Sequence, residues 1–228
     1  MGSIVLESGQ DLPVRSYQTS VGKKAVMAVT GSMLTAYVVA HMIGNLQVFL
    51  GREQINRYAE FLHAHPGLLW PARIVLLAAV LLHIYTAVSL WLLKRKARPV
   101  RYVKESHVPP GYASRTMLFT GPLLGAYVIY HILHLTAGKA GLPFDKQDVY
   151  GNLVAGFSIP VVSALYVVAM VALAFHLFHG IWSMFQSLGI SHPRYTPLLK
   201  RFSAIIAIGV AAGFISVPIA VLTGLVGS

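Results

Sequence analysis

The stretch IVLLAAVLLHIYTAVSLWLL, residues 74–93, contains no charged side chain and is bounded by Arg73 and Lys94. A helix that crosses the hydrocarbon core of a bilayer needs about 20 mostly apolar residues, and this stretch meets that requirement. It also contains a histidine, His83, far from either charged boundary. We therefore predict a membrane-spanning helix with a histidine at membrane depth.

Four further apolar stretches have the same character. The five predicted spans cover residues 25–50, 70–93, 117–136, 157–188 and 202–226. Hydrophobic residues make up 56% of the 228-residue chain and charged residues only 11%, whereas a soluble domain carries about 25% charged residues. We find no convincing internal repeat, so the sequence predicts an all-α membrane protein with one domain, residues 1–228, built as a bundle of five transmembrane helices.

The positive charges predict the orientation of this bundle. The formal net charge is +11, and residues 94–115, between the second and third spans, hold seven of the 18 basic residues. The N-terminal tail and the segment between the fourth and fifth spans lie on the same side, which carries thirteen basic residues in all. Basic residues concentrate in cytoplasmic loops, so we expect a cytoplasmic N-terminus. This topology accounts for the net charge without a nucleic-acid partner.

Histidine is the chemically distinctive residue type of this chain. The chain contains ten histidines and no cysteine, which excludes disulfides, thiolate zinc sites, cysteine-ligated iron–sulfur clusters and c-type haem within it. His63, His65, His107 and His192 fall between predicted spans, where we expect solvated side chains. The histidines within apolar helices are His41, His83, His131, His134, His176 and His179.

Six histidines at membrane depth predict a functional site, because polar side chains there are costly. Zinc usually takes three or four ligands with a carboxylate or thiolate among them, and no predicted span contains an acidic residue. A proton relay would also normally use acidic residues. Haem needs only one or two axial imidazoles per iron, so haem is the favoured interpretation. The alternative is a non-redox protein, such as a transporter or an assembly factor, with histidines that hydrogen-bond between helices.

Helix geometry predicts which histidines can share one iron, because two axial ligands must lie at nearly the same height. At a rise of about 1.5 Å per residue, His41 and His131 each lie about 24 Å from the inner end of their spans. His83 lies about 16 Å and His176 roughly 15–22 Å from that side. These heights predict an outer pair, His41 with His131, and an inner pair, His83 with His176. The two remaining span histidines, His134 and His179, are expected to lie beside a haem or at a quinone site. Alternatively, either one replaces the paired histidine that lies one helical turn away from it as a haem ligand.

Four motifs in the predicted spans together resemble a known family. They are AHMIGNLQVF (40–49), LLHIYTAVSLW (81–91), YVIYHILHLT (127–136) and FHLFHGIWSMFQSLGI (175–190). The set is similar to the single-subunit, two-haem cytochrome b of succinate:quinone oxidoreductases and fumarate reductases, the b558 family. The resemblance extends from about Lys23 to the fifth span, and it implies the same two ligand pairs for two b haems.

The resemblance also implies partners and a location. Such a subunit is a multi-pass protein of the bacterial cytoplasmic (inner) membrane, and it anchors a flavoprotein with FAD and an iron–sulfur subunit on the cytoplasmic face. Dicarboxylate chemistry takes place in the flavoprotein, while the anchor carries electrons between the iron–sulfur subunit and a membrane quinone, commonly menaquinone. An anchor of another respiratory complex, such as a hydrogenase or formate dehydrogenase, is the alternative within redox proteins.

Further residues are assigned to the site as hypotheses. Ser32 and Arg115 are expected near the propionates of the inner haem. Glu53, Glu60 and His134 are assigned to a quinone site on the outer side, with an acid as proton relay. The basic segment 94–115 is expected to contribute to docking of the soluble subunits through Arg98, Arg101 and Lys104. Glycines within the spans, which are expected to let a flat macrocycle approach the backbone, are Gly31, Gly44, Gly121, Gly125 and Gly180.

Overall fold

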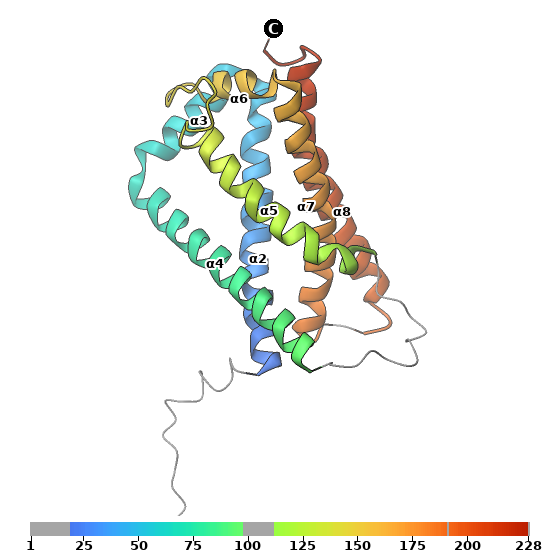
Figure 1. Ribbon diagram of the computed structural model, residues 1–228. Coiled ribbons are helices and arrows are strands. Elements are labelled where there is room, and N and C mark those ends of the chain that lie inside the picture. The colour runs from blue at the N-terminus through green and yellow to red at the C-terminus, as the bar shows by residue number, and fades with distance from the viewer. Residues whose placement is uncertain (1–18, 98–111, 191, 228) are drawn as a thin grey trace, which may run out of the picture.

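The computed structural model describes residues 19–97, 112–190 and 192–227, and within these ranges it contains helices and no strand. The α-helices, joined by one short 3₁₀ segment named η2, follow in the order α2 (Ser20–Asn45), η2 (Leu46–Leu50), α3 (Arg52–Ala64), α4 (Pro66–Lys96), α5 (Tyr112–Leu135), α6 (Val149–Phe157), α7 (Pro160–Ser187) and α8 (Thr196–Leu222). Figure 1 shows the long helices side by side as a bundle, with α3 and α6 across one end.

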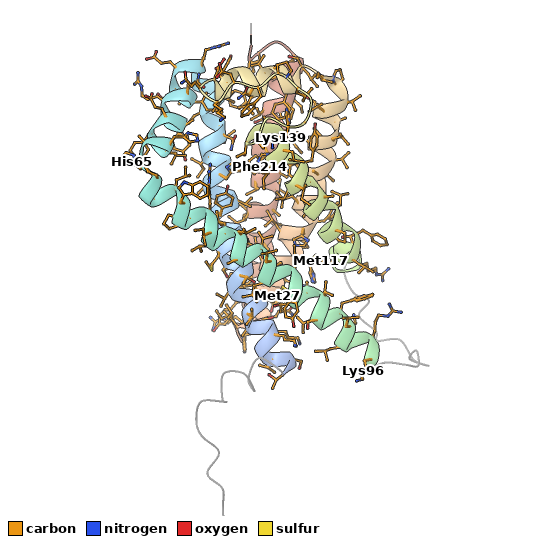
Figure 2. The ribbon with its side chains drawn as sticks, turned by 60° about the vertical axis from the view of Figure 1, so that its left-hand side comes forward. Met27, His65, Lys96, Met117, Lys139 and Phe214 are labelled. Carbon is orange, nitrogen blue, oxygen red and sulfur yellow. The ribbon has the colours of Figure 1, made fainter. Side chains whose placement is uncertain are left out.

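The predicted five spans are confirmed. Five helical segments of the described chain are long and apolar enough to cross a membrane: Ser20–Leu50, Pro66–Lys96, Arg115–Leu135, Pro160–Ser187 and Thr196–Leu222. The start of α2 marks one end of the bundle, the lower end in Figure 1, and α3 and α6 mark the upper end. Figure 2 shows how α4 runs between them, from His65 at the upper end to Lys96 at the lower end.

The sequence interpretation missed two short helices at the upper end. The segment that carries Glu53 and Glu60, expected as a loop, is helix α3, and His63 lies in its last turn. The expected span 157–188 begins three residues later, at Pro160 of α7, because a break at Ser158 and Ile159 separates it from α6, which ends at Phe157. Proline disfavours helical geometry in the preceding residue, and Ile159 is accordingly extended, with φ −90° and ψ 112°.

The packed core lies on one side of the bundle. α7 and α8 contact each other along their length, and both also pack against α2. α4 packs mainly on α2 and α5 mainly on α7. A smaller share of α2, α4 and α5 is buried than of α7 and α8. The histidine-bearing helices α4 and α5 are therefore each held chiefly by one neighbour.

Asp148 joins the two short helices of the upper end. Its Oδ1 caps α6 by accepting from the backbone N–H of Gly151 (3.0 Å) and also accepts from Asn56 of α3 (2.9 Å). Its Oδ2 accepts from Arg52 of α3 (2.6 Å). The hydrogen bond from Asn56 is the main reason that the pKa of Asp148 lies below its ordinary value.

We expect the Asp148→Ala variant to lose about 1 kcal/mol of unfolding free energy at neutral pH, the usual cost of removing a helix cap. Asp148→Asn should lose less, because its side-chain oxygen can still accept from Gly151. Since folding depresses this pKa, the ionised carboxylate stabilises the protein at neutral pH, and its contribution disappears as the pH falls through the folded-state pKa. Thermal unfolding of the purified protein at a series of pH values measures this. A wild-type advantage over Asp148→Ala that stays constant into strongly acidic solution would contradict the assignment.

Candidate functional site

Two histidine pairs lie inside the bundle, each formed between different helices. In the lower pair, His83 of α4 faces His176 of α7, with 6.4 Å between the ring centres and 55° between the ring planes. In the upper pair, His41 of α2 faces His131 of α5, with 5.8 Å between the ring centres and an edge-on arrangement of 81°. The structure therefore brings together the same partners that the heights along the helices predict.

The two pairs lie at different heights. A Cβ atom added to Gly31 of α2 would lie 3.5 Å from Cε1 of His83, so Gly31 marks the height of the lower pair. His41 of the upper pair follows ten residues later on the same helix, which corresponds to about 15 Å along the helix axis. Gly121 marks the same level on α5, where an added Cβ would lie 4.0 Å from Cε1 of His176.

Hydroxyl groups contact the Nδ1 atoms of three of these four rings. Thr30 Oγ1 lies 3.1 Å from Nδ1 of His83, and Thr120 Oγ1 lies 3.3 Å from Nδ1 of His176. The hydroxyl of Tyr166 lies 3.4 Å from Nδ1 of His131. None of these three hydroxyl residues was predicted from the sequence. Their polarity within apolar spans was the available signal, but threonine and tyrosine are too common in such helices for that signal to select them.

The surroundings of the upper pair are mainly aromatic. Tyr37 stacks on His41, with 5.4 Å between ring centres and 9° between planes, and Phe214 of α8 lies 5.8 Å from the same ring. Tyr127 lies 5.7 Å from His131. A cavity of roughly 140 Å³ adjoins both histidines and extends toward α6. Its other polar lining residues are Asn45 at the end of α2, Thr136 just after α5, and Asn152 of α6.

The other two span histidines have different environments. His134 is buried beneath α6, and its Nδ1 lies 2.9 Å from the hydroxyl of Tyr166. A Cβ atom added to Gly156 of α6 would lie 2.5 Å from Nε2 of His134, so this glycine provides the space for the ring. His179 follows His176 by one turn of α7 and is partly buried. Within the described residues, no ring contact joins His179 to another histidine.

The remaining predicted site residues are dispersed. The hydroxyl of Ser32 donates to the backbone oxygen of Ala28 (2.8 Å) and contacts Sδ of Met184 (2.7 Å). Arg115 is exposed at the lower end of α5. Glu53 and Glu60 are exposed on α3, where Glu53 pairs with Arg57. Gly44 faces the ring of Tyr58, 3.0 Å from an added Cβ, so it accommodates a side chain of α3.

One part of the proposed docking segment cannot be placed. Arg98, Arg101 and Lys104 lie outside the described residues.

The paired histidines fit haem better than a bare metal ion. Within the described residues, no group of three or more histidine, aspartate or glutamate side chains could hold a metal ion. Two imidazoles that would bind one metal, each through a nitrogen about 2 Å from it, would have ring centres roughly 6 Å apart, and the observed separations of 5.8 and 6.4 Å agree with this.

An unsatisfied hydroxyl gives an independent indication at the lower pair. Thr86 lies one turn beyond His83 on α4 and is fully buried, and its Oγ1 has no hydrogen-bond partner among the described residues. Such unpaired buried groups are rare in native proteins and often indicate an absent ligand or water. The donor set and this orphaned hydroxyl together fit a prosthetic group with polar substituents.

Comparison with known proteins identifies the family. A family model described as the succinate dehydrogenase/fumarate reductase transmembrane subunit matches residues 92–216, more than half of the chain. The chain belongs to this family. The matched region includes His131 and His176 and the whole of α5, α6 and α7. No curated protein and no solved structure matches the chain. The protein is thus a multi-pass membrane subunit of the succinate dehydrogenase and fumarate reductase class.

Proposed function

We propose that this chain is a di-haem cytochrome b that carries electrons between an iron–sulfur subunit and a membrane quinone in a succinate:quinone oxidoreductase or fumarate reductase. The observation that carries the proposal is the presence of two cross-helix histidine pairs, at two heights, in a member of this family. A b haem bound at each pair would supply reversible one-electron transfer.

In this function, the protein would bind the two haems and keep them at a fixed distance from each other. His83 and His176 would bind one haem and His41 and His131 the other, each through Nε2. The separation of about 15 Å along α2 makes the pairs two steps of one path between the ends of the bundle. Thr86, and the earlier hypotheses Ser32 and Arg115, are proposed as polar partners of the lower haem's propionates.

The charges of the described chain support a cytoplasmic lower end. Basic residues gather there, at the ends of α2, α4, α5 and α8, whereas the four acidic residues within the described ranges lie on or between the upper helices. Cytoplasmic segments carry the excess of basic residues. We therefore propose that a flavoprotein with FAD and an iron–sulfur subunit dock at the lower end, and that the complex lies in a bacterial cytoplasmic membrane.

The quinone, proposed to be menaquinone, would react at the upper end. Glu53 and Glu60 of α3 are proposed as proton relays and His134 as a nearby site residue. If an acid supplies protons to the quinone, Glu53→Gln or Glu60→Gln should slow succinate:quinone reductase activity while succinate oxidation with an artificial acceptor is unchanged. Full quinone reductase activity in both variants would remove this part of the proposal.

Purification in mild detergent tests the function as a whole. We expect the tagged chain to copurify with a flavoprotein and an iron–sulfur protein and to show the absorption spectrum of b haem at two haems per chain. Mass spectrometry of the partners and pyridine haemochrome quantification give these results directly. Partners of a hydrogenase or formate dehydrogenase type would contradict the complex proposed here, and a colourless preparation would contradict a cytochrome.

Single substitutions of the paired histidines should separate the two haems. His41→Leu or His131→Leu should remove the upper haem or convert it to high spin and leave the lower haem low spin. His83→Leu and His176→Leu should have the converse effect and should also weaken docking of the soluble subunits, because that pair is closer to the lower end. Low-temperature absorption and electron paramagnetic resonance spectra of all four variants measure this.

His63→Leu is the matched control for these four variants. His63 is exposed on α3 and contacts neither pair, so its replacement should leave both haems intact. Two intact low-spin haems in any of the four pair variants would show that the substituted histidine is not a ligand. His134 would then be the first substitute for His131, and His179 for His176.

A further inference from the structure

Helices α2 and α5 share a sequence pattern that the sequence analysis did not recognise. Residues 30–41 read TGSMLTAYVVAH and residues 120–131 read TGPLLGAYVIYH. Seven of the twelve aligned positions are identical, which gives the pattern T-G-x-x-L-x-A-Y-V-x-x-H. Met27 and Met117, both labelled in Figure 2, are also equivalent in this register. The expectation that the chain lacks an internal repeat is therefore wrong for these two helices.

The repeat makes the same contacts twice. Its final histidines form the upper pair, and its tyrosines, Tyr37 and Tyr127, pack on those histidines from one turn below. The repeat's Thr-Gly dipeptide lies at the lower pair. Each repeat thus supplies one ligand to the upper pair and presents a threonine and a glycine to one histidine of the lower pair.

The threonine contacts are equivalent in the two halves. Thr30 reaches from α2 to Nδ1 of His83 on α4 at 3.1 Å, and Thr120 reaches from α5 to Nδ1 of His176 on α7 at 3.3 Å. Both threonines are buried, with 4% and 7% of their surfaces exposed. In both helix pairs, a buried threonine of one helix therefore contacts Nδ1 of a histidine on the other helix.

The direction of the first hydrogen bond follows from the other partner of the hydroxyl. Thr30 donates its proton to the backbone oxygen of Val26 at 2.8 Å, so its oxygen is left to accept a proton from Nδ1 of His83. A neutral imidazole that carries its proton on Nδ1 has its free lone pair on Nε2. The threonine therefore selects the tautomer in which Nε2 can bind iron.

We infer that Thr30 and Thr120 are positioning residues that fix the tautomer and ring orientation of His83 and His176 and so set the properties of the lower haem. This inference rests on the proposed function, because it requires haem at the lower pair. Helix packing alone does not require the hydroxyls, since valine has nearly the same shape as threonine and brings no polar group that must be satisfied in an apolar helix.

The inference predicts the redox effect of removing either hydroxyl. A hydrogen-bond acceptor at Nδ1–H makes an imidazole a stronger electron donor to its metal, which favours the oxidised iron. Thr30→Val and Thr120→Val should therefore each raise the midpoint potential of the lower haem or reduce its occupancy. The upper haem should keep its potential in both variants.

Three controls make the effect specific. Thr30→Ser and Thr120→Ser keep the hydroxyl and should retain a potential close to that of the wild type. Tyr166→Phe removes the hydroxyl near His131, so it should change the potential of the upper haem and leave the potential of the lower haem unchanged. In every variant, the haem that is not targeted reports that the chain has folded.

Potentiometric titration of the purified complex, with optical and electron paramagnetic resonance detection, measures both haems in each variant. A lower haem that shifts or is lost in the valine variants and is retained in the serine variants supports the inference. Unchanged potentials in both valine variants overturn it, as does an equal effect of valine and serine. A wild-type complex without haem at the lower pair contradicts the proposed function itself, and the inference with it.

Discussion

The structure depends on the requirement that a backbone in lipid must satisfy its hydrogen bonds within the protein. The long helices meet this requirement, but their polar side chains must find partners of their own. In this bundle the paired histidines find theirs on other helices, where the rings face each other and hydroxyls contact Nδ1 of three of the four rings. The polar centre of the bundle is thus a set of contacts between side chains of different helices.

The spans could be predicted from the sequence because hydrocarbon thickness fixes the length of an apolar run, and charges define its ends. The smaller features of the fold could not. Helix α3 is short and mostly polar, so composition made it resemble a solvated loop. The break before α7 lies among apolar residues, and only Pro160 indicated it. Local backbone geometry decides such details, whereas the apolar pattern alone decides where the membrane is crossed.

The histidine partners could be predicted from helical rise, because the rise per residue is nearly constant and converts sequence position into height. The contacts around them could not be predicted in this way. The hydroxyl of a helical threonine usually hydrogen-bonds to the backbone of its own helix. Thr30 does so, and its oxygen also contacts Nδ1 of His83. The repeat in α2 and α5 was missed because many of its positions are ordinary apolar residues. The repeat becomes recognisable in the structure, because its two copies make equivalent contacts with the histidines.

The uneven packing of the bundle has a consequence for its dynamics. α2, α7 and α8 contact one another, whereas α4 and α5 are each attached mainly along one side. Local opening of a protein begins at the elements with the fewest packing contacts. α4 and α5, which each carry one histidine of a pair, are therefore the helices expected to separate first. Their separation would part both histidine pairs while α2, α7 and α8 stay together.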